Sequence, residues 1–184
     1  SYQPNDLKKK ILEKTFKREE VGLPKNNFVF CSFNQSSKVL PKIFDIWMRI
    51  LKKVDGSVLW LLESNNKTCK NLKDHANKRG IDPGRLIFAD RLPIEKHLAR
   101  HKAADLFIDT FPYNAHTTCS DALWAGLPVL TLQGETFASR VASSLLNAIG
   151  LSELITKNSY EYEKKAIELG NNLSKVVGLK EKIE

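Results

Sequence analysis

The sequence predicts an α/β fold in which a parallel β-sheet carries helices on both faces. Short, strongly apolar runs such as 58–62 have no polar face, as expected of strands that are buried on both sides. These runs alternate with longer segments whose apolar residues recur at helical spacing. Polar clusters directly follow three of the runs, and ligands bind at this end of the strands in parallel sheets.

The first elements follow a polar beginning. Residues 1–20 are charged and lack an apolar face, so we assign them to a lead-in segment and residues 21–184 to one domain. We expect a first strand at 28–33 and a first helix at 41–54. Asp55 and Gly56 then favour a turn into a second strand at 57–62.

The remaining elements continue this alternation. A helix at 68–79 is expected to end before Gly80, because glycine is typical of the position just past a helix. Further strands are expected at 85–89, 105–109 and 128–131, and further helices at 94–101, 137–148 and 160–172. The apolar neighbours of Trp47, Trp60 and Trp124 indicate that these side chains belong to the core.

Residues 105–121 are the most informative segment. The apolar run 106–108 ends at Asp109, and Pro112 and Asn114 then indicate a loop. We expect a helix to start at Ser120 and Asp121, directly after His116, Thr117 and Thr118. Backbone amides, hydroxyls and an imidazole at a helix N-terminus suit a phosphate, whereas the Asp121 carboxylate suits ribose hydroxyls. The same residue types also cap helices without any ligand, and the pattern alone leaves both interpretations open.

Composition excludes several classes of function. The formal net charge of +8 fits an anionic partner such as nucleic acid, an acidic substrate or a sugar nucleotide. However, lysine runs such as 8–10 and 164–165 lack interleaved aromatics, so we expect solvated surface and no nucleic-acid partner. The chain has no Gly-x-Gly-x-x-Gly or P-loop motif, which argues against a dehydrogenase or a P-loop NTPase.

Cysteine use and hydropathy indicate the compartment. The three cysteines are widely spaced and form neither a disulfide framework nor a Cys-x-x-Cys metal motif. The sequence has no run of 18 apolar residues and no signal-peptide pattern. We therefore expect a cytoplasmic location and no membrane partner.

Several motifs together resemble one family. His-Thr-Thr-x-x-Asp-x-Leu-Trp-Ala-Gly-x-Pro-Val-x-Thr runs from His116 to Thr131, and Gly-Glu-Thr-Phe-Ala-Ser-Arg follows at 134–140. With 33–38 and 91–100, these segments resemble the C-terminal catalytic lobe of the protein O-GlcNAc transferase and SPINDLY family, glycosyltransferase family 41. The resemblance spans about residues 19–182. It implies a Rossmann-like, C-terminal lobe of a two-lobed GT-B-type glycosyltransferase.

The resemblance also implies a donor site. It places Gln35 and Lys38 on the donor pyrophosphate, where a lysine can neutralise the leaving group. It implies phosphate binding by His116, Thr117 and Thr118 and ribose binding by Asp121. It further implies a donor pocket lined by His97 and Arg100, with Leu92 and Tyr113 at the base and sugar. Lys38 and His97 are the candidate catalytic residues. Ile94 departs from the pattern, because the animal enzymes carry a lysine near the diphosphate there.

The implied activity is transfer of a sugar, GlcNAc from UDP-GlcNAc, to Ser or Thr hydroxyls of acceptor proteins with inversion. Two alternatives are a protein O-fucosyltransferase lobe that uses GDP-fucose and a non-catalytic binding module on the same fold. We expect no cofactor and no metal, since the sequence lacks the Asp-x-Asp pair of many metal-dependent sugar transferases. The family's N-terminal catalytic lobe and tetratricopeptide repeats are not in this sequence, so we expect a fragment that is inactive alone.

Overall fold

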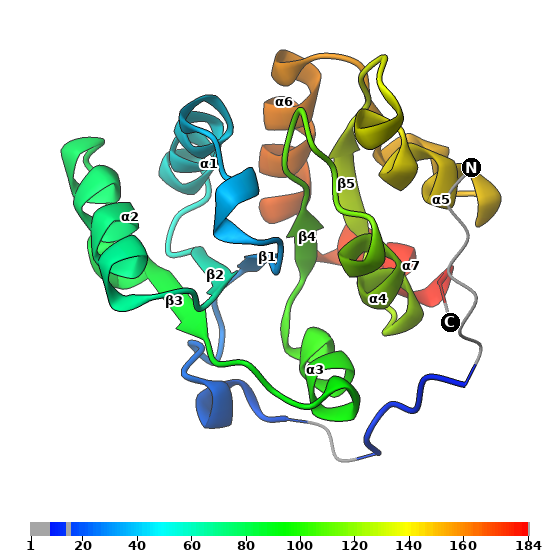
Figure 1. The fold of residues 1–184 in the computed structure, drawn as a ribbon, viewed down its shortest axis with the longest axis horizontal. Coiled ribbons are helices and arrows are strands. Elements are labelled where there is room, and N and C mark those ends of the chain that lie inside the picture. Colours follow the sequence, from blue (N-terminus) through cyan, green and yellow to red (C-terminus); the bar gives the residue numbers. More distant parts are fainter. Residues whose placement is uncertain (1–7, 14–15, 184) are drawn as a thin grey trace.

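The structure is a computed structural model that describes residues 8–13 and 16–183. Its parallel strands form one sheet in the order β3-β2-β1-β4-β5-β6 (Figure 1). The strands are β1 (Val29–Ser32), β2 (Val58–Leu62), β3 (Leu86–Ala89), β4 (Leu106–Ile108), β5 (Val129–Leu132) and β6 (Ile155–Thr156). The predicted parallel α/β fold is therefore confirmed.

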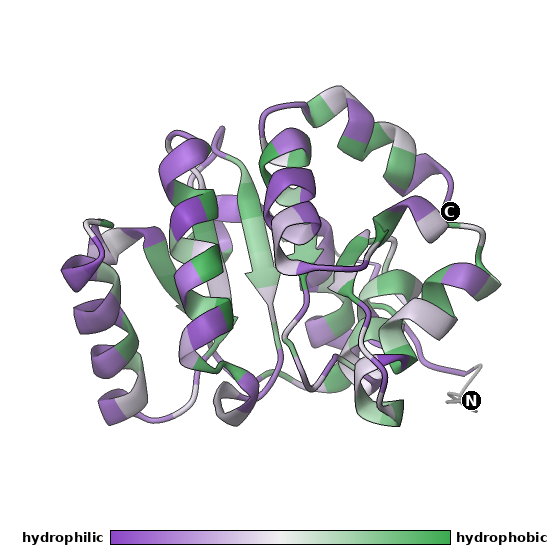
Figure 2. Ribbon diagram, turned by 90° about the horizontal axis from the view of Figure 1, so that it is seen from above, coloured by the Kyte–Doolittle hydropathy of each residue, from purple (hydrophilic) through white to green (hydrophobic). Residues whose placement is uncertain are grey.

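Helices cover the sheet on both faces. They are α1 (Pro41–Lys53), α2 (Asn66–Lys78), α3 (Ile94–Arg100), α4 (Thr117–Trp124), α5 (Val141–Ala148), α6 (Ser159–Gly170) and α7 (Leu173–Glu181). Helix α1 packs beside α6, and α4 contacts both α3 and α5. Figure 2 shows apolar strands enclosed by helices whose outer surfaces are largely hydrophilic.

Asparagine side chains start three of the helices. Asn65, Asn158 and Asn172 accept hydrogen bonds from backbone amides in the first turns of α2, α6 and α7, at 2.8, 2.9 and 3.2 Å. Such caps satisfy donors that have no partner within the helix. The sequence therefore encodes these helix starts locally, in addition to the apolar faces that pack on the sheet.

Several predicted boundaries are wrong. Helix α4 starts at Thr117, with His116 as its N-cap, and not at Ser120. The segment 137–148 is a 3-10 turn at Phe137–Ser139 followed by α5. Strand β6 and helix α7 are absent from the sequence-based prediction, which ends with a single helix at 160–172.

The core contains two of the three tryptophans. Trp47 and Trp60 are 0% and 1% exposed, as predicted, and Trp47 Nε1 donates to the hydroxyl of buried Tyr162 at 3.1 Å. Trp124 is 47% exposed, so its assignment to the core is wrong. It is the last residue of α4, and its Nε1 donates to the Lys9 carbonyl at 3.1 Å.

The strand order reverses direction between β1 and β4. The chain moves outward from β1 to β2 and β3, then returns to pair β4 with the other side of β1. The loops that follow β1 and β4 therefore meet at the carboxyl edge of the sheet, where parallel α/β sheets bind ligands. The described parts of the lead-in segment are residues 8–13, which pass beside α3 and α4 (Figure 1), and residues 16–20. Its proposed boundary at residue 20 stays a prediction.

Candidate functional site

The loops after β1 and β4 are joined through one buried carboxylate. Asp109, at the end of β4, is 1% exposed. Its Oδ1 accepts hydrogen bonds from the backbone amides of Thr110 and Ala115, both at 2.7 Å, and from Asn34 Nδ2 at 3.3 Å. Its Oδ2 accepts from Thr131 Oγ1 at 2.7 Å. Burial nevertheless raises the pKa of Asp109 to about 6, because the hydrogen bonds only partly offset the lost hydration.

Asn34 extends this network to helix α4. Its side-chain oxygen accepts a hydrogen bond from Thr118 Oγ1 at 2.6 Å, while its amide donates to Thr110 Oγ1 at 2.9 Å. The first turn of α4 is thereby fixed to the end of β1. Backbone amides in a first helical turn point along the axis and attract an anion, so the start of α4 is a candidate anion-binding position at the carboxyl edge of the sheet.

Lys38 crosses from the first loop to the second. Its ammonium donates to the Asn114 carbonyl at 3.0 Å and lies 4.1 Å from the centre of the Tyr113 ring. That ring stacks on His116, with 5.1 Å between the ring centroids. Burial lowers the pKa of Lys38, and the Asp109 charge opposes this shift. Lys38, Tyr113 and His116 thus form one cluster, as the motif positions predict.

Asp121 lies one turn into α4 and has an ionic partner. Its side chain is 8% exposed, and Oδ1 accepts a hydrogen bond from Lys9 Nζ at 2.5 Å. The lysine run at 8–10 was expected to be solvated surface, and that expectation is wrong for Lys9, whose side chain is 18% exposed. A partner 112 residues away leaves no local signal in the sequence.

His97 and Arg100 share one face of α3, as predicted from their spacing. Arg100 is 2% exposed; its Nη2 donates to His97 Nδ1 at 2.6 Å, and its guanidinium lies 4.6 Å from the Phe33 ring centre. Burial, with help from His101 and Arg100, lowers the pKa of His97 to about 3. The imidazole is therefore neutral at pH 7. Because Nδ1 accepts from Arg100, the ring proton lies on Nε2, which can donate to a ligand.

The remaining predicted residues lie at the rim. Gln35 is exposed beside Asn34, and Leu92 is half-buried before α3. Ile94 is 47% exposed at the start of α3. The structure therefore brings most predicted residues to the carboxyl edge of the sheet, in two neighbouring groups on α4 and α3. Sequence reasoning missed Asn34 and Asp109 as organisers, although their positions directly after two apolar strands could have indicated them.

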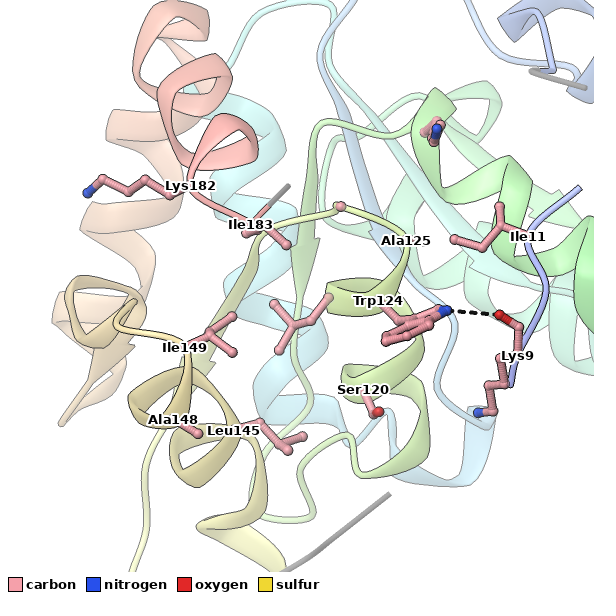
Figure 3. A pocket seen from close by; sticks show the side chains of 13 residues that line it. Lys9, Ile11, Ser120, Trp124, Ala125, Leu145, Ala148, Ile149, Lys182 and Ile183 are labelled. Atoms are coloured by element: carbon pink, nitrogen blue, oxygen red, sulfur yellow. Dashed lines mark hydrogen bonds between the residues drawn. The ribbon is translucent and has the colours of Figure 1, made fainter. Parts of the chain in front are cut away.

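Two cavities flank this region. A cavity of about 180 Å³ lies beside the loop after β1 and is lined in part by Asn34, Gln35 and Arg91. A cavity of about 620 Å³ lies on the other side of α4, where Trp124, Leu145 and Ile149 form apolar walls (Figure 3). The larger cavity is not lined by His116, Thr117 or Thr118, so cavity volume alone does not identify the candidate site.

Two general properties concern the described part of the chain, residues 8–13 and 16–183. No cluster of three or more His, Cys, Asp or Glu side chains there is arranged to hold a metal ion. None of the helices described is both long enough and apolar enough to cross a membrane.

The fold and site define a class of protein. A doubly wound parallel sheet with an anion-suited helix start at its switch point is the architecture of nucleotide-binding α/β domains. The family model described as Glycosyl transferase family 41 matches residues 5–184, and the chain belongs to that family.

Named relatives agree with this membership. The chain is 40% identical over 97% of its length to the probable UDP-N-acetylglucosamine–peptide N-acetylglucosaminyltransferase SEC of Arabidopsis thaliana. It is 38% identical over 90% of its length to the UDP-N-acetylglucosamine–peptide N-acetylglucosaminyltransferase of Caenorhabditis elegans. A SPINDLY protein of Solanum lycopersicum is 32% identical over 84% of the chain. The match covers only 19%, 14% and 17% of these proteins, respectively.

A solved structure supports the same fold. A mutant of the Thermobaculum terrenum O-GlcNAc transferase superposes with a TM-score of 0.82 at 34% sequence identity. The superposition covers 85% of this chain and 31% of the solved chain. The predicted fold, one Rossmann-like lobe of a GT-B-type glycosyltransferase, is therefore confirmed, and the chain is a glycosyltransferase region that resembles O-GlcNAc transferases.

Proposed function

We propose that this chain is the donor-binding lobe of an inverting glycosyltransferase that transfers GlcNAc from UDP-GlcNAc to Ser or Thr hydroxyls of proteins. The observation that carries the proposal is the convergence of Lys38, His116 and the first turn of α4 at the carboxyl edge of β1 and β4. The partners that this proposal implies are the nucleotide sugar, the acceptor protein, the family's N-terminal catalytic lobe and its tetratricopeptide repeats.

The chemistry of leaving-group departure supports roles for these groups. As the glycosidic bond breaks, negative charge grows on the nucleoside diphosphate. Lys38 and the amides of α4, with the Thr117 hydroxyl, can stabilise that charge without a metal ion. The Thr118 hydroxyl can join them if it releases the Asn34 side-chain oxygen. His97 on α3 is neutral and protonated on Nε2, so it can donate a hydrogen bond to the donor substrate. Arg100 fixes the orientation of its ring.

The nucleotide is proposed from the relatives. The three relatives reported above, at 38%, 40% and 32% identity, all carry UDP-N-acetylglucosamine in their names. These names favour UDP over GDP as the bound nucleoside diphosphate. In this assignment Leu92 and Tyr113 contact the base and sugar, Gln35 contacts the diphosphate and Asp121 contacts the ribose.

An NMR titration of the 184-residue chain with UDP and GDP tests the proposal. We expect UDP to shift the amide resonances of residues 34–38 and 116–121, and GDP to bind more weakly. Shifts confined to another face would contradict the site, and a stronger response to GDP would favour the fucosyl alternative. Failure of both nucleotides at millimolar concentration would favour a binding module without a donor site.

Lys38→Ala separates a leaving-group role from a surface role. In the full-length enzyme we expect turnover to fall by roughly 100-fold or more, while donor affinity changes less, because the interaction strengthens as charge develops. Lys42→Ala, an exposed lysine on α1, is the matched control. Equal turnover of the two variants would remove Lys38 from the site.

A further inference from the structure

Residues 9–12 lie across α4 and α3 and are held by three interactions. Lys9 Nζ binds Asp121 Oδ1 at 2.5 Å. The Lys9 carbonyl accepts from Trp124 Nε1 at 3.1 Å, the contact drawn in Figure 3. The Leu12 amide donates to the Glu95 carbonyl of α3 at 3.2 Å. Because both backbone contacts lie outside the ion pair, the position of Lys9 does not depend on the ion pair alone.

The ion pair is largely removed from water. The side chains of Lys9 and Asp121 are 18% and 8% exposed. A carboxylate at this depth is costly without a counter-charge. It also lies one turn from the end of α4 that suits an anion, where an uncompensated carboxylate would repel a diphosphate. A nearby ammonium group removes both penalties.

We propose that Lys9 is a positioning residue of the donor site, which orients the Asp121 carboxylate for ribose and cancels its charge beside the diphosphate. This inference rests on the proposed function. An ionised carboxylate has two oxygens with about four acceptor positions, so Asp121 can keep Lys9 on Oδ1 and still accept from ribose hydroxyls. The lead-in segment is then part of the site and not a spacer.

Calorimetric titration of UDP into the 184-residue chain and its variants tests this role. Lys9→Ala should weaken UDP binding about tenfold, in the range of one charge-assisted hydrogen bond. Lys9→Arg, which keeps the charge, should bind within about threefold of the parent chain. Lys10→Ala is the matched control, because Lys10 is an exposed neighbour in the same run.

A second arm tests whether Lys9 acts through Asp121. In an Asp121→Asn background, Lys9→Ala should change UDP affinity less than about threefold, because the charge that Lys9 compensates has gone. An undiminished tenfold loss in that background would overturn the positioning role, since Lys9 would then act on the nucleotide directly. Tighter UDP binding by Lys9→Ala would also overturn it, because the lysine would then compete with ribose.

The outcomes distinguish this inference from the proposed function. If the parent chain does not bind UDP, the proposed function fails first. If the parent binds UDP and Lys9→Ala equals Lys10→Ala, only the role of Lys9 is overturned. Thermal melts of each variant accompany the titrations, and the comparison of Lys9→Arg with Lys9→Gln replaces Lys9→Ala if the alanine variant does not melt cooperatively.

Discussion

Asp109→Asn tests whether the lost hydration of the buried Asp109 carboxylate outweighs the hydrogen bonds that it accepts. The folded protein holds the pKa of Asp109 at about 6, above the ordinary value of 3.8, because the carboxyl is buried. The unfolded chain therefore loses this proton more readily, and the group lowers stability as pH rises from about 4 to 6. At 1.36 kcal/mol per pKa unit, the full effect above pH 6 is about 3 kcal/mol.

Asparagine preserves the shape of the group and removes its charge. Its oxygen can accept from the Thr110 and Ala115 amides, and its amide can donate to Thr131 Oγ1. We expect the variant to be more stable than the parent chain by up to about 3 kcal/mol at pH 7.5 and by about 1 kcal/mol at pH 4.5. The melting temperature at pH 7.5 would rise by roughly 6–12 °C.

Urea unfolding at the two pH values measures the difference, with Asp74→Asn, an exposed carboxylate on α2, as control. A variant that is less stable than the parent at pH 7.5 would refute the reasoning, because the hydrogen bonds to the ionised carboxylate would then outweigh its lost hydration. A stability gain that does not depend on pH would also refute it, since the effect would not come from ionisation.

Two further predictions concern stability. Burial lowers the pKa of His101 to about 4 from the ordinary 6.5, so this group alone should lower stability by about 2 kcal/mol as pH falls to 5. His101→Gln should reduce that loss in urea unfolding at pH 7.5 and 5.0, and equal acid sensitivity of both chains would contradict the assignment. Arg18 donates to both oxygens of Asp105 at 2.8 Å, and Arg18→Ala should cost about 3 kcal/mol, because the buried carboxylate would keep only the Val29 amide at 2.8 Å and the Lys180 ammonium at 4.0 Å. Arg49→Ala, which breaks the more exposed pair with Glu163, should cost less than about 1 kcal/mol in the same assay, and similar costs for both would refute the distinction.

The sheet could be predicted because its signals are local. Each of the first five strands is an apolar run, so its existence follows from the sequence, whereas the order of the strands in the sheet was not predicted. Strand β6 has two residues and leaves too short a run to detect. Helix α7 was missed because it follows α6 after only Asn171 and Asn172 and contains Gly178, which lowers helix propensity.

From residue types alone, the candidate site could be predicted only where its residues are contiguous, whereas Lys38 and His97 follow from the family resemblance. His116 caps α4 and residues 117–121 form its first turn, so their types predict an anion site. The start of α4 was misplaced because Thr and Ser fit the cap position at several successive residues. The Lys9–Asp121 pair, the Asn34–Thr118 bond and the exposure of Trp124 depend on how distant segments meet, which periodicity does not encode.

The hydrogen bond of Tyr162 also bears on when the end of β4 can fold during translation. This buried residue of α6 donates to the Asp109 carbonyl at 2.8 Å, while Trp47 donates to its hydroxyl. Asp109 emerges from the ribosome 53 residues before Tyr162, so the end of β4 lacks the Tyr162 hydroxyl as a hydrogen-bond partner until then. The loop after β4 is therefore expected to reach its final conformation only after α6 has emerged, near the end of translation of this region.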